Sequence, residues 1–153
     1  MKQRVVFRLL PLFSPVFFVL LLCGGCGKQP AEHRVVAPRD GAIRIPVSEV
    51  RDGKVHFFTY KKSGKRINYF IRTDGKDNLS ACFDACFTCY KQKKGYREEG
   101  TDLVCNECSL KFRLADEHWD NSRGCSPIAL KSRIDNNEVV IMTEDLERGG
   151  KLF

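Results

Sequence analysis

The sequence CFTC at residues 86–89 and the sequence CNEC at residues 105–108 decide the fold of this chain. Together they read as C-x2-C-x15-C-x2-C. Two residues between cysteines form a tight knuckle that points both sulfurs at one tetrahedral ion, and two knuckles complete its coordination. The spacing therefore predicts a four-thiolate metal site whose ligands are Cys86, Cys89, Cys105 and Cys108.

A disulfide framework is the competing interpretation of these cysteines. The chain begins like an exported protein, and oxidising compartments favour disulfides. A bridge within a C-x2-C pair is strained and usually redox-active, however, and two such pairs would be unusual structural links. We therefore favour metal over disulfides at the two knuckles.

The first 26 residues have the organisation of a targeting segment. Lys2, Arg4 and Arg8 precede an apolar run that extends from Leu9 to Cys23. As a helix, this run would reach only about 22 Å, which is shorter than a bilayer core of about 30 Å. Residues 1–26 are thus predicted to be a signal peptide, and the basic residues before the apolar run favour an extracytoplasmic (periplasmic) location for the rest of the chain.

The end of this segment, LCGGCG at residues 22–27, resembles the lipobox of bacterial lipoproteins. The resemblance implies that Cys26 is the acylated first residue of the mature chain and holds it on the membrane lipid. Lipoboxes usually carry leucine at the position of Cys23, so an uncleaved signal anchor is the alternative. Both alternatives predict a membrane-associated protein.

The remaining 127 residues suffice for one domain with its own core. Residues 27–40 are polar and contain two prolines, which predicts a flexible tether. Residues 41–153 are then a single cysteine-rich metal-binding domain. Its basic clusters favour solvated loops over docking on anionic lipid or an acidic partner, and no nucleic-acid recognition motif is visible.

The composition of the domain predicts a mainly β fold. The segments 54–61 and 65–73 are rich in β-branched and aromatic residues, and Ser63-Gly64 supplies a hairpin turn between them. On the second strand, alternation of Ile67, Tyr69 and Ile71 with polar residues predicts one buried face. A single helical turn is expected at 81–87. Further short strands are expected at 102–104, 110–114, 132–134 and 138–143.

Six segments carry a close resemblance to a known family: IRIPV (43–47), FF (57–58), ACFDACFTCY (81–90), KGYREEG (94–100), VCNEC (104–108) and GCSP (124–127). They resemble the FtrD-like family of membrane iron–sulfur proteins, over nearly all of the chain after the tether. The resemblance implies an iron–sulfur cluster and a role in ferrous iron uptake. The expected role is that of a ferredoxin-like electron carrier beside a membrane permease and copper-dependent periplasmic partners.

The order of strands and cysteine loops also resembles a Rieske domain in its architecture. Rieske loops hold a two-iron cluster with two cysteines and two histidines, and Cys89 and Cys108 would here occupy the histidine positions. An all-thiolate cluster should have a far lower potential than a histidine-ligated one, or the site holds a single zinc ion instead. The expected fold is thus a small Rieske-like or zinc-ribbon-like β domain.

Cys82 and Cys125 lie outside the C-x2-C pairs. The Rieske resemblance implies a disulfide between them that braces the cluster loops. The competing interpretation makes either one an additional ligand, since Cys82 is only four residues from Cys86. His118 is expected to be an exposed loop residue.

Three functions from different classes remain open at this point. They are an iron–sulfur electron carrier, a zinc-stabilised module that partners a permease, and a thiol–disulfide oxidoreductase. Arg4 and Arg8 are separated by three residues, so the twin-arginine pair that exports folded cluster proteins is missing, which favours zinc. We identify no catalytic residues, because no hydrolase or transferase constellation is present in the sequence.

Overall fold

The computed structural model describes residues 31–119 and 124–153, which form three β-sheets and one short α-helix. The predicted targeting segment 1–26 lies outside the described residues. Among those residues, every helix is too short or too polar to cross a bilayer.

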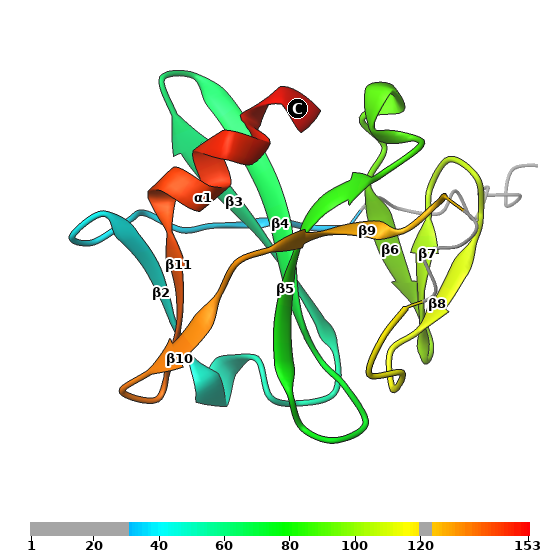
Figure 1. Ribbon diagram of the computed structural model, residues 1–153, viewed down its shortest axis with the longest axis horizontal. Helices are drawn as coiled ribbons and strands as arrows, with labels where there is room; N and C mark the ends of the chain where they lie inside the picture. Colours follow the sequence, from blue (N-terminus) through cyan, green and yellow to red (C-terminus); the bar gives the residue numbers. More distant parts are fainter. Residues whose placement is uncertain (1–30, 120–123) are drawn as a thin grey trace, which may run out of the picture.

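The largest sheet has five strands in the order β1-β3-β4-β5-β9 (Figure 1). Only β1 runs parallel to its neighbour, and the other pairs are antiparallel. The strands are β1 (Arg34–Val35), β3 (Val55–Lys62), β4 (Lys65–Thr73), β5 (Leu79–Cys86) and β9 (Pro127–Leu130).

Two three-stranded antiparallel sheets flank this central sheet, one at each end of the molecule in Figure 1. The first contains β2 (Ala42–Pro46), β10 (Arg133–Asp135) and β11 (Glu138–Met142). The second contains β6 (Tyr96–Glu99), β7 (Asp102–Cys105) and β8 (Lys111–Arg113). Within residues 31–119 and 124–153, the helices are α1 (Thr143–Arg148) and three 3₁₀ turns: η2 (Val47–Glu49), η3 (Tyr90–Gln92) and η4 (Gly149–Leu152).

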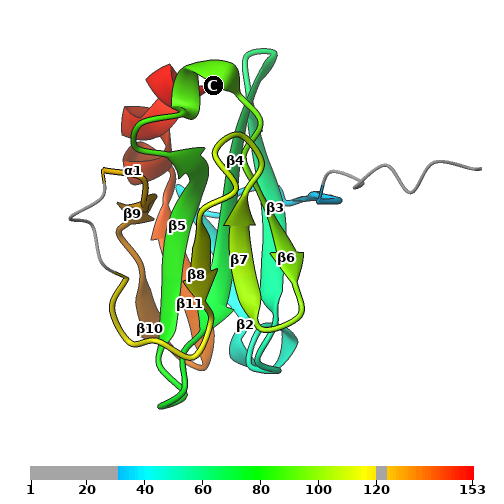
Figure 2. The same ribbon diagram turned by 90° about the vertical axis from the view of Figure 1, so that its right-hand side faces the viewer.

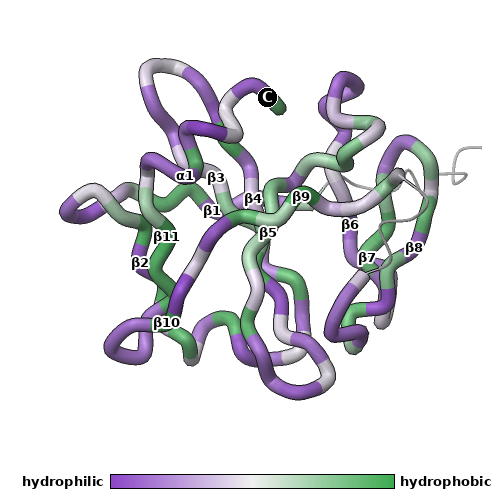
Figure 3. Tube along the Cα trace, in the orientation of Figure 1, coloured by the Kyte–Doolittle hydropathy of each residue, from purple (hydrophilic) through white to green (hydrophobic). Residues whose placement is uncertain are grey.

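The central sheet carries a hydrophobic core on each face. Tyr69 and Ile71 of β4 pack with Ile43 and Ile141 of the β2–β11 sheet. The alternate residue Phe70 packs with Leu103 and the rest of the second core, which the β6–β8 sheet covers. Figure 2 shows this second sheet standing in front of β4 and β5, and Figure 3 shows apolar residues gathered on β2, β11 and the central strands.

The two cores explain where the strand predictions succeed and fail. The hairpin of β3 and β4 is confirmed, and its turn residues Ser63 and Gly64 have positive φ angles of 49° and 78°, as tight hairpin turns require. The predicted burial of Ile67, Tyr69 and Ile71 on one face of β4 is confirmed, but the other face is buried as well, because the β6–β8 sheet covers it. Phe70 and Arg72 on that face are both buried.

The expected helical turn at 81–87 is also wrong, because these residues form most of β5. This strand is paired with β4 on one side and β9 on the other. A strand buried on both faces shows no alternation of apolar and polar residues, so the period that identifies an exposed strand is missing here.

Part of the segment predicted to be a tether contacts the domain. Arg34–Val35 forms β1 against β3, and the Arg34 guanidinium lies 5.0 Å from the centre of the Phe58 ring. His33 Nε2 lies 2.9 Å from a carboxylate oxygen of Asp84 on β5. Contacts with the domain therefore begin before the predicted boundary at residue 41.

Candidate metal centre

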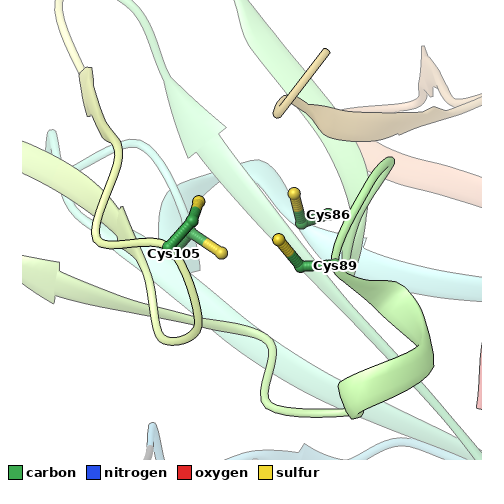
Figure 4. A group of neighbouring side chains, drawn as sticks. Cys86, Cys89 and Cys105 are labelled. Atoms are coloured by element: carbon green, nitrogen blue, oxygen red, sulfur yellow. The ribbon is translucent and has the colours of Figure 1, made fainter. Parts of the chain in front are cut away.

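The four knuckle cysteines converge, although they come from two different sheets. Cys86 ends β5 and Cys105 ends β7, while Cys89 and Cys108 follow in the turns after these strands. The four sulfur atoms lie within 4.8 Å of one another. Figure 4 shows Cys86 and Cys89 on one side of the centre and Cys105 on the other. The fold thus brings together the four cysteines that the spacing predicts as ligands of one ion.

Each knuckle folds back so that backbone N–H groups point at its first sulfur. Burial acts to raise the pKa of Cys86, but hydrogen bonds from the N–H groups of Cys89 and Thr88 help to bring it down to about 7. Burial raises the pKa of Cys105 to about 11, against the N–H groups of Cys108 and Glu107. The first knuckle thus favours a thiolate at Cys86, whereas burial outweighs the N–H groups at Cys105 and favours its neutral thiol.

Cys89 and Cys108, the second cysteines of the two knuckles, differ in exposure and in the direction in which their pKa is shifted. Cys89 is half-buried, and burial together with the neighbouring thiols raises its pKa. Cys108 is exposed. Burial acts to raise its pKa too, but hydrogen bonds from the Leu110 N–H group and the neighbouring thiols lower it overall. The centre thus reaches the protein surface at Cys108.

A buried carboxylate joins the two knuckles, although no pattern in the sequence points to it. Asp84 lies two residues before Cys86 and accepts a 2.7 Å hydrogen bond from the backbone N–H of Tyr96. Gly95 comes directly before Tyr96. Its carbonyl accepts a 3.0 Å hydrogen bond from the N–H of Asn106 in the second knuckle. Contacts between residues so distant in the chain leave no local pattern, so only the fold reveals them.

In this connection, the backbone of Gly95 lies very close to the carboxylate of Asp84. Its φ is +60°, and a Cβ atom there would overlap the carboxylate group of Asp84. Gly95→Ala is therefore expected to lower the free energy of unfolding by about 2–4 kcal/mol and to weaken metal binding, because the carboxylate must move away from Tyr96. Urea unfolding and metal titration of the variant would measure both effects.

Gly64→Ala is the matched control for this variant. Gly64 has a similar φ of +78°, but a Cβ atom at this residue would have no other atom within 4 Å. This variant should lose only about 1 kcal/mol, from its backbone conformation alone, and keep its metal affinity. Equal losses in the two variants would show that the contact with Asp84 is unimportant.

Cys82 and Cys125 do not form the expected disulfide, because both are free thiols. Cys82 packs in the second core, where burial raises its pKa to about 12. Cys125 instead joins the centre. Its sulfur lies 3.3 Å from that of Cys86, 3.6 Å from that of Cys89 and 3.2 Å from that of Cys108. The predicted role of a brace between loops is therefore not supported for either residue.

The aromatic residues near the cysteines mostly pack in the cores. Tyr96 and Phe112 are buried beside the centre in the second core, and Phe83 belongs to the first. Phe87 differs, because it lies inside the first knuckle and is 66% exposed. His118 is exposed, in agreement with the prediction, while its neighbour Trp119 packs against Phe112.

The family match agrees with the cysteine pattern. The family described as "Membrane iron-sulfur containing protein FtrD-like" matches residues 50–153. No curated protein matches the chain. A crystal structure of the quaternary ammonium Rieske monooxygenase CntA in complex with an inhibitor is similar with a TM-score of 0.44 and 17% identity. That similarity covers 75% of this chain and 32% of the monooxygenase chain, about a third of its length. The chain belongs to the FtrD-like family of membrane iron–sulfur containing proteins.

Proposed function

We propose that this protein is a membrane-tethered, extracytoplasmic electron carrier that holds iron between its two knuckles and serves an iron-uptake system. One observation carries the proposal: four cysteine sulfurs from two knuckles lie within 4.8 Å of one another, and the centre reaches the surface at Cys108. A surface-reaching centre of this kind can exchange electrons with a partner without admitting a substrate.

The donor set fits the cofactor that the family description names. Iron–sulfur centres are held by cysteine thiolates, and every candidate ligand of this site is a cysteine. Bound iron would supply a reversible one-electron couple, whose potential depends on net charge, hydrogen bonds to sulfur and exposure. The residues of the chain control all three of these properties.

The protein residues near the centre have separate tasks in this proposal. The N–H groups that point at Cys86 and Cys105 stabilise thiolate charge. The buried rings of Tyr96 and Phe112 exclude water on the inner side. On the outer side, the exposed Phe87 borders an apolar hollow of about 700 Å³, which Phe83, Ile128 and Leu130 also line. This hollow offers a redox partner an apolar contact beside the centre.

The membrane tether determines which partner the centre meets. Residues 1–26 would hold the domain on the extracytoplasmic face, beside an integral permease or another membrane-bound redox protein. A short flexible tether raises the effective concentration of a carrier to the millimolar range near such a partner. A weak docking contact at the hollow would then be sufficient for electron transfer.

A structural zinc site is the second candidate, because the sulfur spacing suits a single tetrahedral ion. With a metal–sulfur distance of about 2.3 Å, the sulfurs of a single tetrahedral ion lie about 3.8 Å apart. The four sulfurs here are nearly that compact. In this alternative the domain is a zinc-stabilised module that binds the permease and carries no electrons.

Metal analysis and voltammetry of the native protein would distinguish the two functions. The full chain, extracted from membranes in detergent and purified without oxygen, should contain iron and absorb visible light through sulfur-to-iron charge transfer. It should also give a reversible one-electron wave at a negative potential, as expected of an all-thiolate centre. Stoichiometric zinc with no wave would contradict the electron-carrier proposal and support the structural module.

A further inference from the structure

Cys125 places a fifth thiol at a centre that needs only four. Its sulfur is within 3.6 Å of the sulfurs of Cys86, Cys89 and Cys108. These distances are close to the edge of about 3.8 Å expected between ligands of one tetrahedral ion. Cys125 is therefore near enough to the centre to serve as a ligand.

The backbone on both sides of Cys125 is fixed to the first knuckle. The Phe87 N–H donates a 2.9 Å hydrogen bond to the carbonyl of Ser126, and the Thr88 hydroxyl donates to the carbonyl of Gly124. Pro127, at the start of β9, pairs with Cys86. The neighbours of Cys125 thus hold its side chain over the centre, so the contact is part of the fold.

We propose that Cys125 is an exchangeable fifth ligand, which takes the metal position of Cys108 when that thiolate leaves the ion. This proposal rests on the metal centre described above but not on the identity of the metal. Two observations select Cys108 for exchange. It is the nearest sulfur to Cys125, at 3.2 Å, and it is exposed, so its side chain can turn into water. Cys86 and Cys105 are buried and accept backbone N–H groups.

The exchange conserves charge and protons. The bond between the metal and the Cys108 sulfur breaks, and a bond between the metal and the Cys125 sulfur forms. The proton of the Cys125 thiol passes to the Cys108 thiolate over the 3.2 Å contact. Four thiolates would hold the metal before and after the exchange, so the exposed side of the centre could open without water as a lasting ligand.

Cobalt(II) titration of the full chain in detergent, after removal of native metal, would test this exchange. The charge-transfer and ligand-field bands of cobalt report how many thiolates surround it. Cys108→Ala should keep a four-thiolate spectrum, with an affinity within about tenfold of that of the native protein. Cys108→Ala combined with Cys125→Ala should lose that spectrum and bind at least about 100-fold more weakly.

Two controls make the result specific. Cys82→Ala combined with Cys108→Ala removes the same number of cysteines but leaves Cys125 in place, and it should behave like Cys108→Ala alone. Far-ultraviolet circular dichroism of each metal-free variant checks that it folds. Loss of the four-thiolate spectrum in Cys108→Ala alone would overturn the exchange. An equal loss in Cys125→Ala alone would also overturn it, by making Cys125 an obligatory ligand. Because cobalt replaces the native metal, either outcome is independent of whether the protein carries electrons.

Discussion

Cys86→Ser is expected to abolish stoichiometric metal binding. The Cys86 sulfur is buried, accepts hydrogen bonds from the N–H groups of Thr88 and Cys89, and lies within 4.8 Å of the other knuckle sulfurs. Serine is a poor ligand for the ions that thiolates select. Cys125 should not compensate here, because Cys86 is buried at the end of β5 and its replacement cannot turn into water to free the ligand position.

Metal binding at the two knuckles is also expected to contribute to folding, so this variant should lose stability. A four-thiolate structural site contributes about 10–16 kcal/mol of apparent binding free energy. At this site the binding joins a knuckle on the central sheet to a knuckle on the β6–β8 sheet. We expect the metal content of Cys86→Ser to fall at least about 100-fold and its thermal midpoint to fall by about 10 °C or more.

Cys82→Ala is the matched control for Cys86→Ser. Cys82 lies on the same strand and is also buried, but it packs in the second core and is outside the group of converging sulfurs. It should lose only about 1–2 kcal/mol of stability and retain its metal. Metal content by mass spectrometry and thermal unfolding of both variants would provide the comparison. Full metal content in Cys86→Ser would exclude the two-knuckle site.

The convergence of the four knuckle cysteines was predictable from sequence because a C-x2-C knuckle is a local structure. Two residues between cysteines suffice to form the turn, and two such turns close around one ion. The β3–β4 hairpin was predictable for the same reason, through the local requirements of Ser63 and Gly64. The strand β5 was not predictable, since its two neighbouring sheets bury both of its faces and remove the alternating pattern.

The contacts that position the site depend on residues far apart in the chain. Asp84 reaches Tyr96, and Gly95 reaches Asn106, only after β5 and the β6–β8 sheet have packed together. The contact of Cys125 with the centre could not be predicted from sequence for the same reason. Its resemblance-based pairing with Cys82 was reasonable for a loop cysteine, but β9 carries Cys125 to the first knuckle instead. No spacing rule relates residue 125 to residue 86.

Phe70→Ala is expected to have the second large effect, a loss of stability. The reason is the packing of Phe70 beneath the centre. Phe70 is fully buried on β4, and its ring centre lies 5.7 Å from that of Phe57, 6.0 Å from that of Tyr96 and 6.4 Å from that of Trp119. It therefore fills the space between the central sheet and the β6–β8 sheet. Truncation should lower the free energy of unfolding by about 3–5 kcal/mol, as large cavities in cores do.

The same truncation should weaken metal binding, although Phe70 is not a candidate ligand. Cys105 ends β7, and β7 is held against the central sheet by the core that Phe70 fills. A looser β6–β8 sheet would allow the second knuckle to move away from the first, and metal binding must then restore the packed arrangement.

Phe87→Ala provides the control, because Phe87 is an exposed phenylalanine within the site itself. It should change stability by less than about 0.5 kcal/mol. Urea unfolding with and without metal would measure both variants. If Phe70→Ala lost stability but kept native metal affinity, the knuckles would be held together by the Asp84 connection rather than by the core.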